Sequence, residues 1–447
     1  MSAWRRAALV GAILALAHLR HGALSAADVP LVRVPDPRSG ENPVFPLPAL
    51  DEPPVGRAYT DPHFGTRIVR ATDRGKMRHE YARFDPFNCD GSLILLHDIG
   101  EGAFVVCRTN AMPWDAAAQR VRVVELEEIR WDPKDAQCVW GQRGFRLIRL
   151  EVATGREEIV KDFAADATVG PLLKANPDLY RITMKGEGES SLDLRYWVFG
   201  LQGEKDDYRL RFVFVWDRER DRVEGIRPIA IEESKIDWVG ASPLGNWVLI
   251  GGDHDNGPPL AGLTLANRAL TRFHRLDYAT GHADVGLDAD GREVIVMQNV
   301  RTDCIDLIPL DWKTQPILES GGSYAGTNRI PLVRLQYSEQ GPTLSSGVHI
   351  SCNAAGCAVV STYIEPGAAG KNWLDRSLLL VRLDPADPRA YYLAKLHNTT
   401  GAYWEETHAT VSRDGSKVVW ASNWGRSVGE ERVSVMKLDL PEGWRTR

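Results

Sequence analysis

Three histidines occupy related places in the chain and together could bind a divalent metal. His349 and His408 each stand seven residues before a glycine in a predicted turn, and His282 stands nine residues before its own. Imidazoles brought together from three strands suit a transition metal, and Cys352 is a further candidate ligand. We expect zinc, with manganese or calcium as alternatives.

Two acidic residues accompany these histidines. Asp284 follows His282 by two positions, and Glu406 precedes His408 by two. Each carboxylate could complete the coordination of a metal or orient an imidazole ring. The competing interpretation is that the histidines are buried and only bond to neighbouring backbone carbonyls.

A second group of reactive side chains lies in the segment RHEYARFDPFNCDGSLILLH, residues 78–97. His79, Tyr81 and Arg83 alternate, so on a strand they would share one face. Asn88 and His97 follow, the latter on the next strand. A histidine, a tyrosine and an arginine on one face suit proton transfer to and from an acidic substrate. The alternative is that Tyr81 and Arg83 pack between neighbouring structural units.

A third group makes residues 180–211 the part of the chain richest in arginine and tyrosine. Tyr180 begins an expected inner strand, and Arg195 and Tyr196 lie on the strand after the GEGESS turn. The remaining members are Arg181, Tyr208, Arg209 and Arg211. The alternative is a solvated charged face, which is favoured for Arg209 and Arg211.

The elements that carry these residues recur along the chain. A short apolar strand runs into a polar turn and is followed by a β-branched strand, about seven times at intervals of 45 to 65 residues. The turns centre on Gly91, Asp135, Gly188, Gly245, Gly291, Gly356 and Gly415. Such a period with four strands per unit predicts an all-β, seven-bladed β-propeller that forms a single domain over residues 59–447. A pair of β-sandwiches or a β-solenoid is the alternative.

Two consequences of this architecture concern the site. The strand before each turn is innermost, so its polar side chains line the central channel and meet a ligand. The last unit, which ends near Leu440, should pair with a strand after Asp61 and close the ring, because closure leaves no unpaired edge.

The N-terminus carries an export pattern. Arg5 and Arg6 precede the apolar stretch 7–19, and Ser25, Ala26 and Ala27 offer small residues for cleavage. We therefore expect a signal peptide over residues 1–27, a proline-rich extended arm over 28–58, and a secreted or periplasmic protein. No later segment is long and apolar enough to span a membrane.

Cysteine usage and charge limit the other possibilities. An oxidising compartment permits disulfides, and Cys352 and Cys357 flank a turn that they could bridge. There is no CxxC pair, GxSxG elbow, phosphate-binding Walker loop or HExxH motif. The formal net charge is −6, and no dense lysine and arginine stripe predicts nucleic-acid binding.

At the first unit the chain resembles a known family. The segment 78–97 is similar to the first blade of seven-bladed propeller polysaccharide lyases, the ulvan lyases and their bacterial relatives. The matching positions are His79, Tyr81, Arg83, Asn88, Asp90, Gly91 and His97. More distantly, the chain resembles oligogalacturonate lyases, whose propeller holds manganese with histidines.

The resemblance implies roles for residues elsewhere. The family has a catalytic tyrosine with a downstream arginine that neutralises the uronate, which would be Tyr180 and Arg195 here. It also implies a metal held by histidines and a cysteine, corresponding to His282, His349, Cys352 and His408.

These expectations combine into one reaction, β-elimination next to a uronic acid. Arg195 would pair with the substrate carboxylate, His79 or His97 would remove the proton, and Tyr180 would protonate the leaving oxygen. Binding contacts would come from Tyr81, Arg83, Asn88 and Tyr196. We therefore expect a monomeric lyase acting on an acidic, sometimes sulfated polysaccharide. The alternative is a non-catalytic propeller that binds a glycan or a protein partner.

Overall fold

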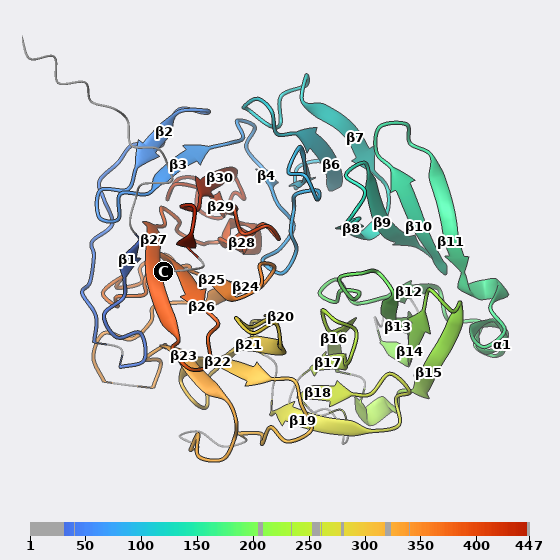
Figure 1. The fold of residues 1–447 in the computed structure, drawn as a ribbon. Coiled ribbons are helices and arrows are strands. Elements are labelled where there is room, and N and C mark those ends of the chain that lie inside the picture. The colour runs from blue at the N-terminus through green and yellow to red at the C-terminus, as the bar shows by residue number, and fades with distance from the viewer. Residues whose placement is uncertain are drawn as a thin grey trace, which may run out of the picture.

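The computed structural model describes residues 31–39, 41–203, 209–233, 235–252, 260, 262–278, 281–317, 323–338 and 340–444. Within these ranges the chain forms seven antiparallel sheets arranged in a ring around one axis (Figure 1). The predicted all-β, seven-bladed propeller is confirmed, and the described residues contain only one short α-helix. The expected signal peptide, residues 1–27, lies outside the described residues.

The first four blades each consist of four consecutive strands, with the first strand nearest the axis (Figure 1). Blade 1 contains β4 (Met77–Arg78), β5 (Leu93–Asp98), β6 (Ala103–Arg108) and β7 (Arg120–Val124). Blade 2 contains β8 (Glu127–Trp131), β9 (Cys138–Arg143), β10 (Arg146–Glu151) and β11 (Glu157–Asp162). Blade 3 contains β12 (Arg181–Thr183), β13 (Tyr196–Gln202), β14 (Leu210–Asp217) and β15 (Arg222–Pro228). Blade 4 contains β16 (Ile236–Ala241), β17 (Val248–Gly252), β18 (Leu263–Ala266) and β19 (Phe273–Asp277).

The last two blades gain strands from the N-terminal part of the chain. Blade 5 contains β20 (Ala283–Leu287), β21 (Glu293–Asn299), β22 (Cys304–Pro309) and β23 (Ile330–Arg334). Blade 6 contains β24 (Val348–Ser351), β25 (Cys357–Thr362), β26 (Ser377–Arg382) and β27 (Arg389–Lys395), with β1 (Val32–Arg33) added at its rim. Blade 7 contains β28 (Thr410–Val411), β29 (Lys417–Ser422) and β30 (Ser434–Asp439), followed by β3 (Arg67–Arg70) and β2 (Ala58–Thr60).

The ring closes by pairing its two ends in blade 7. Strand β3 lies antiparallel to β30, with Ile68 opposite Leu438. This is the predicted closure, and it leaves no free edge between the first and last units. Residues 41–54 of the N-terminal arm contain no helix or strand and run beside blades 6 and 7.

The hydrophobic core lies between neighbouring blades. Alternate side chains of each strand face the next sheet, so Val296 of blade 5 and Ile350 and Val360 of blade 6 share one buried cluster. Burying each such side chain contributes about 1.5–3 kcal/mol. The hairpins behind the inner strands turn at glycines, such as Gly356 and Gly415, whose positive φ of +80° and +67° favours that residue.

The helical elements lie outside the sheets. They are the 3-10 turns η2 (Phe163–Ala165), η3 (Ile231–Glu233) and η4 (Tyr403–Glu405), and the helix α1 (Val169–Ala175). None of the helices in the described ranges is long and apolar enough to cross a membrane.

The cysteines do not pair as the sequence suggested. All six are free thiols. Cys357 begins β25, and its Sγ donates a hydrogen bond to the carbonyl of Ala354 at 3.6 Å. The proposed bridge between Cys352 and Cys357 is therefore absent.

Candidate active site

The three histidines predicted to bind a metal come together around the axis. The ring centroids of His282 and His349 are 4.6 Å apart, and those of His349 and His408 are 3.9 Å apart. All three lie where an inner strand begins: His349 is in β24, and the other two precede β20 and β28. Inner strands of neighbouring blades converge on the channel, so histidines far apart in sequence meet there.

His282 lies further along the chain from its turn than His349 does. Its carbonyl oxygen accepts the Gln298 N–H at 2.8 Å, one step beyond the pair Ala283 and Met297 of the blade 5 hairpin. That hairpin has no register shift, so no bulge separates His282 from its glycine. Its ring still reaches the same end of the channel as His349.

Glu406 joins two of the histidines. Its Oε2 lies 2.7 Å from His349 Nε2 and 3.3 Å from His408 Nε2. One ligand atom from each of these three residues can be chosen so that all lie within 4.8 Å of one another. His349 Nδ1 and His408 Nε2 are buried and make no hydrogen bond to the described residues. Buried imidazole nitrogens without hydrogen bonds, beside a partly buried carboxylate, fit a divalent metal, so the residues suit the predicted ion.

Burial keeps these imidazoles neutral. Loss of hydration lowers the pKa of His282 to about 3, and it lowers the pKa values of His349 and His408 well below the usual range. Loss of hydration also raises the pKa of Glu406. A neutral imidazole offers the lone pair that a metal or a proton needs.

An irregularity in blade 1 inserts side chains into the channel. Arg78 pairs with His97, and Phe87 pairs with Ile94. Arg78 and Phe87 are thus nine positions apart, whereas their pairing partners, His97 and Ile94, are only three positions apart. The extra residues cannot remain in the ladder, so they form a loop that bulges toward the axis.

Tyr81, at the centre of this loop, joins the histidines. Its hydroxyl lies 3.4 Å from His282 Nδ1. Its ring centroid is 4.8 Å from that of His408 and 5.7 Å from that of His349. Burial raises the pKa of the Tyr81 phenol well above its usual range, so the hydroxyl keeps its proton.

The same loop overturns the expected shared face of His79, Tyr81 and Arg83. His79 is fully buried, and its Nε2 contacts the carbonyl oxygen of His408. Arg83 points elsewhere, forms an ion pair with Glu187 at 3.0 Å, and stacks over Trp238. The alternation prediction fails because residues 79–86 are not a strand.

Arg78 holds the neighbouring segments together. This side chain is fully buried, which lowers the pKa of its guanidinium to about 10. It donates to the carbonyl oxygens of His79, at 2.9 Å, and Trp404, at 2.7 Å. A third contact is with Nδ1 of His408. Arg78 therefore positions His408 from blade 1, a role that no pattern in the sequence indicates.

We call His282, His349 and His408, together with Glu406 and Tyr81, the histidine group. His97 lies outside it. Its ring stacks on Phe104 at 4.8 Å and meets the edge of Trp404 at 5.0 Å. Burial is the main cause that lowers its pKa to about 4. These contacts anchor Trp404, and neither His97 nor the buried His79 is placed as the expected base beside the other reactive groups.

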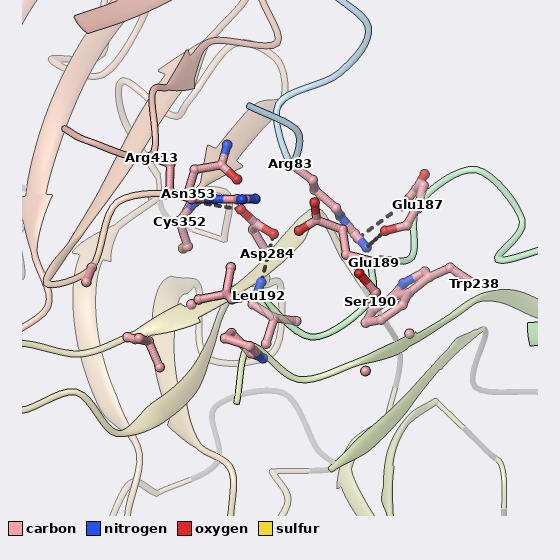
Figure 2. Close-up of a pocket in the computed structure, with 17 residues that line it drawn as sticks. Arg83, Glu187, Glu189, Ser190, Leu192, Trp238, Asp284, Cys352, Asn353 and Arg413 are labelled. Atoms are coloured by element: carbon pink, nitrogen blue, oxygen red, sulfur yellow. Dashed lines mark hydrogen bonds and ion pairs between the residues drawn. The ribbon is translucent and has the colours of Figure 1, made fainter. Parts of the chain in front are cut away.

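Cys352 lines a cavity one level deeper in the channel. This cavity has a volume of about 120 Å³, and its lining includes Arg83, Glu187, Asp284 and Cys352. Figure 2 shows these side chains around it. The Asp284 carboxylate accepts hydrogen bonds from the backbone N–H groups of Cys352, at 2.5 Å, and Val285, at 2.8 Å. Burial raises the pKa of the Cys352 thiol well above its usual range. Cys352 is not part of the group formed by His349, Glu406 and His408, in which Glu406 is the third residue beside the two histidines.

The third blade separates the predicted acid from the predicted clamp. The Tyr180 N–H donates to the carbonyl of Gln202, at the end of β13. Arg195 precedes the start of that strand and pairs with Asp217 and Glu219, each at 2.9 Å. A seven-residue strand is about 20 Å long, so Tyr180 and Arg195 cannot act on one bond.

Two residues expected to bind substrate support the framework instead. Tyr196 is nearly buried, with the guanidinium groups of Arg195 and Arg268 over its ring at 4.9 and 4.2 Å. Asn88 caps the first-blade turn, where its Oδ1 accepts the N–H of Leu93 at 2.9 Å. Neither belongs to the histidine group.

Comparison with known proteins identifies the fold. No protein-family model matches the chain, and no curated protein matches its sequence. Among solved structures, an oligogalacturonate lyase from Vibrio parahaemolyticus shares 12% identity at a TM-score of 0.54. An oligogalacturonate lyase in complex with manganese shares 14% identity at a TM-score of 0.53. Each comparison covers 86% of this chain and 96% of the other.

These likenesses define the class as a seven-bladed propeller with the architecture of oligogalacturonate lyases. At such low identity they establish the fold alone. They agree with the more distant of the two resemblances stated from the sequence. The resemblance to ulvan lyases stays a sequence-based prediction.

Proposed function

We propose that this protein is a polysaccharide lyase that cleaves beside a uronic acid by β-elimination. The observation that carries the proposal is the meeting of Tyr81, His282, His349, Glu406 and His408 at one end of the channel. These groups come from blades 1, 5, 6 and 7. The contacts between their side chains are not part of strand pairing or of a turn. Buried titratable groups gathered in this way are typical of catalytic sites.

A divalent metal fits the part of this group formed by His349, Glu406 and His408. Imidazole and carboxylate together suit zinc or manganese, whereas calcium prefers a shell of oxygen atoms. When bound, such an ion supplies positive charge beside the substrate carboxylate, where negative charge builds during elimination. The solved oligogalacturonate lyase with manganese is consistent with this choice.

Tyr81 and His282 then divide the proton transfers. The C–H bond next to the carboxylate breaks, His282 takes the proton, and the electron pair forms the new double bond. The C–O bond to the leaving sugar breaks as its oxygen takes the Tyr81 proton. His282 returns its proton to the Tyr81 phenolate across the 3.4 Å contact, so both groups regain their starting state.

The electrostatics of the pair suit these roles. Tyr81 keeps its proton until the leaving oxygen needs it, because burial raises its pKa. Neutral His282 has a free lone pair at working pH, because burial lowers its pKa to about 3. A substrate carboxylate placed nearby would raise the pKa of His282 and strengthen it as a base.

Export is part of the same proposal. An acidic polymer is an extracellular or periplasmic substrate, and the basic and apolar pattern of residues 1–27 matches a signal peptide. We propose that the mature enzyme acts as a monomer outside the cytoplasm. Edman sequencing of the exported protein should begin after Ala27.

The function is tested with a panel of uronate polymers that includes oligogalacturonate and sulfated ulvan. A lyase creates unsaturated chain ends, which are followed by their ultraviolet absorbance, whereas a hydrolase creates none. The expected result is absorbance growth with at least one polymer. If no polymer yields unsaturated ends but one binds, the protein is a glycan-binding propeller and the proposal fails.

A further inference from the structure

Tyr403 is an exposed aromatic side chain beside the histidine group. It is 49% exposed, although most large apolar side chains of the described residues are buried. Its ring centroid lies 5.1 Å from that of His408. Ligand sites combine aromatic side chains with a few placed polar groups, and Tyr403 beside His408 provides that combination.

The turn that carries Tyr403 is rigid. Glu405 is fully buried, and its carboxylate accepts hydrogen bonds from the backbone N–H groups of Gly401, Ala402, Gly429 and Glu431. A carboxylate that ties four backbone donors fixes the turn before any ligand arrives. Binding therefore costs little ordering at this position.

Trp404, the next residue in the chain, is also held in place. The centroid of the Trp404 ring lies 4.9 Å from that of Tyr403, and Trp404 also contacts His97. The Trp404 carbonyl accepts a hydrogen bond from Arg78. These contacts hold the exposed ring in one place while leaving about half of it open.

We infer that Tyr403 is a stacking platform for a sugar ring of the substrate, next to the residue being cleaved. This inference rests on the proposed function, since it names a contact of the same site. The faces of an aromatic ring are electron-rich, and the C–H bonds of a sugar ring point weakly positive hydrogens at them. Neutral sugars and uronates share this C–H face, so the platform selects a pyranose ring and leaves charge recognition to the histidine group.

The test separates the ring from the hydroxyl. Tyr403→Ala removes the platform, Tyr403→Phe keeps it, and Ile231→Ala is a control at another exposed apolar side chain. We measure kcat and KM on the best polymer, with melting temperature as a check on folding. Tyr403→Ala should raise KM about tenfold, which corresponds to about 1.4 kcal/mol, with kcat nearly unchanged. Tyr403→Phe and Ile231→Ala should match the wild type.

Calorimetric binding of a uronate oligosaccharide to Tyr81→Phe, alone and combined with Tyr403→Ala, gives a readout without turnover. A tenfold weaker Kd in the double variant supports the platform. An unchanged KM and Kd in folded Tyr403→Ala overturns it while leaving the lyase proposal intact. If wild-type protein binds a polymer without cleaving it, the lyase proposal fails, and the Kd comparison still decides the platform. Absence of binding to every polymer in the panel overturns the platform as well.

Discussion

The three histidines and the third blade are both rich in reactive residues, but only the histidines come together in the structure. His282, His349 and His408 come from three blades and meet within 5 Å between neighbouring ring centroids. Tyr180 and Arg195 come from one blade and lie at opposite ends of one strand. Residues of one sheet are kept apart by its ladder, whereas the starts of inner strands are brought together by ring closure. Position along the inner strand is therefore a better guide to this site than local density of reactive residues.

The largest expected difference between the two regions comes from removing one hydroxyl in each. Tyr81→Phe should lower turnover by on the order of 10²–10⁴, because it removes the proposed proton donor. Tyr180→Phe should stay within about twofold of wild type, because the proposed reaction takes its proton from Tyr81 and assigns no step to Tyr180. Rates of unsaturated-end formation measure both, and circular dichroism checks the fold. Equal losses of turnover in the two variants would show that the third blade takes part in the reaction as much as the histidine group does.

A second experiment sharpens the division of labour within the histidine group. His349→Gln should weaken the affinity for the metal at least about tenfold, because it removes a proposed ligand. His282→Gln should retain the metal but lose turnover, because that residue is proposed as the base. Elemental analysis after dialysis, together with titration of zinc and manganese, measures the difference. Metal loss in His282→Gln would restore this residue to the ligand set that the sequence suggested.

A smaller effect concerns a buried imidazole away from the axis. His397 stacks on Trp424 at 4.0 Å, and burial lowers its pKa to about 4. Its unfolded pKa is near 6.5, so the unfolded state binds the extra proton and stability falls as pH drops from about 6.5 to 4. His397→Gln should therefore reduce the pH dependence of the unfolding free energy in this range. The reduction is at most about 1.4 kcal/mol per pH unit, which corresponds to one proton.

Urea unfolding at several pH values measures that slope, while turnover at neutral pH should be unchanged. An unchanged slope would show that His397 takes up a proton in the folded state, so that burial alone does not keep an imidazole neutral here. Loss of turnover would instead extend the functional region beyond the axis.

The sequence determined the fold and the principal place of the site. Recurrent turns and alternating strands specify blades, because one blade cannot bury both of its faces alone. The shared position of His349 and His408 before their turns predicted that the two rings would meet, because strand geometry is regular.

Only the tertiary structure decided the partners of those rings. Tyr81 reaches His282 through a bulge, Arg78 of blade 1 contacts His408, and Glu406, two positions before His408, reaches His349 of blade 6. A bulge breaks the period of two on which alternation depends, so no local pattern indicates where its side chains point. Two contacts of the site, Arg78 with His408 and Tyr81 with His282, join residues more than 200 positions apart, and their geometry is set by how the seven blades close around the axis.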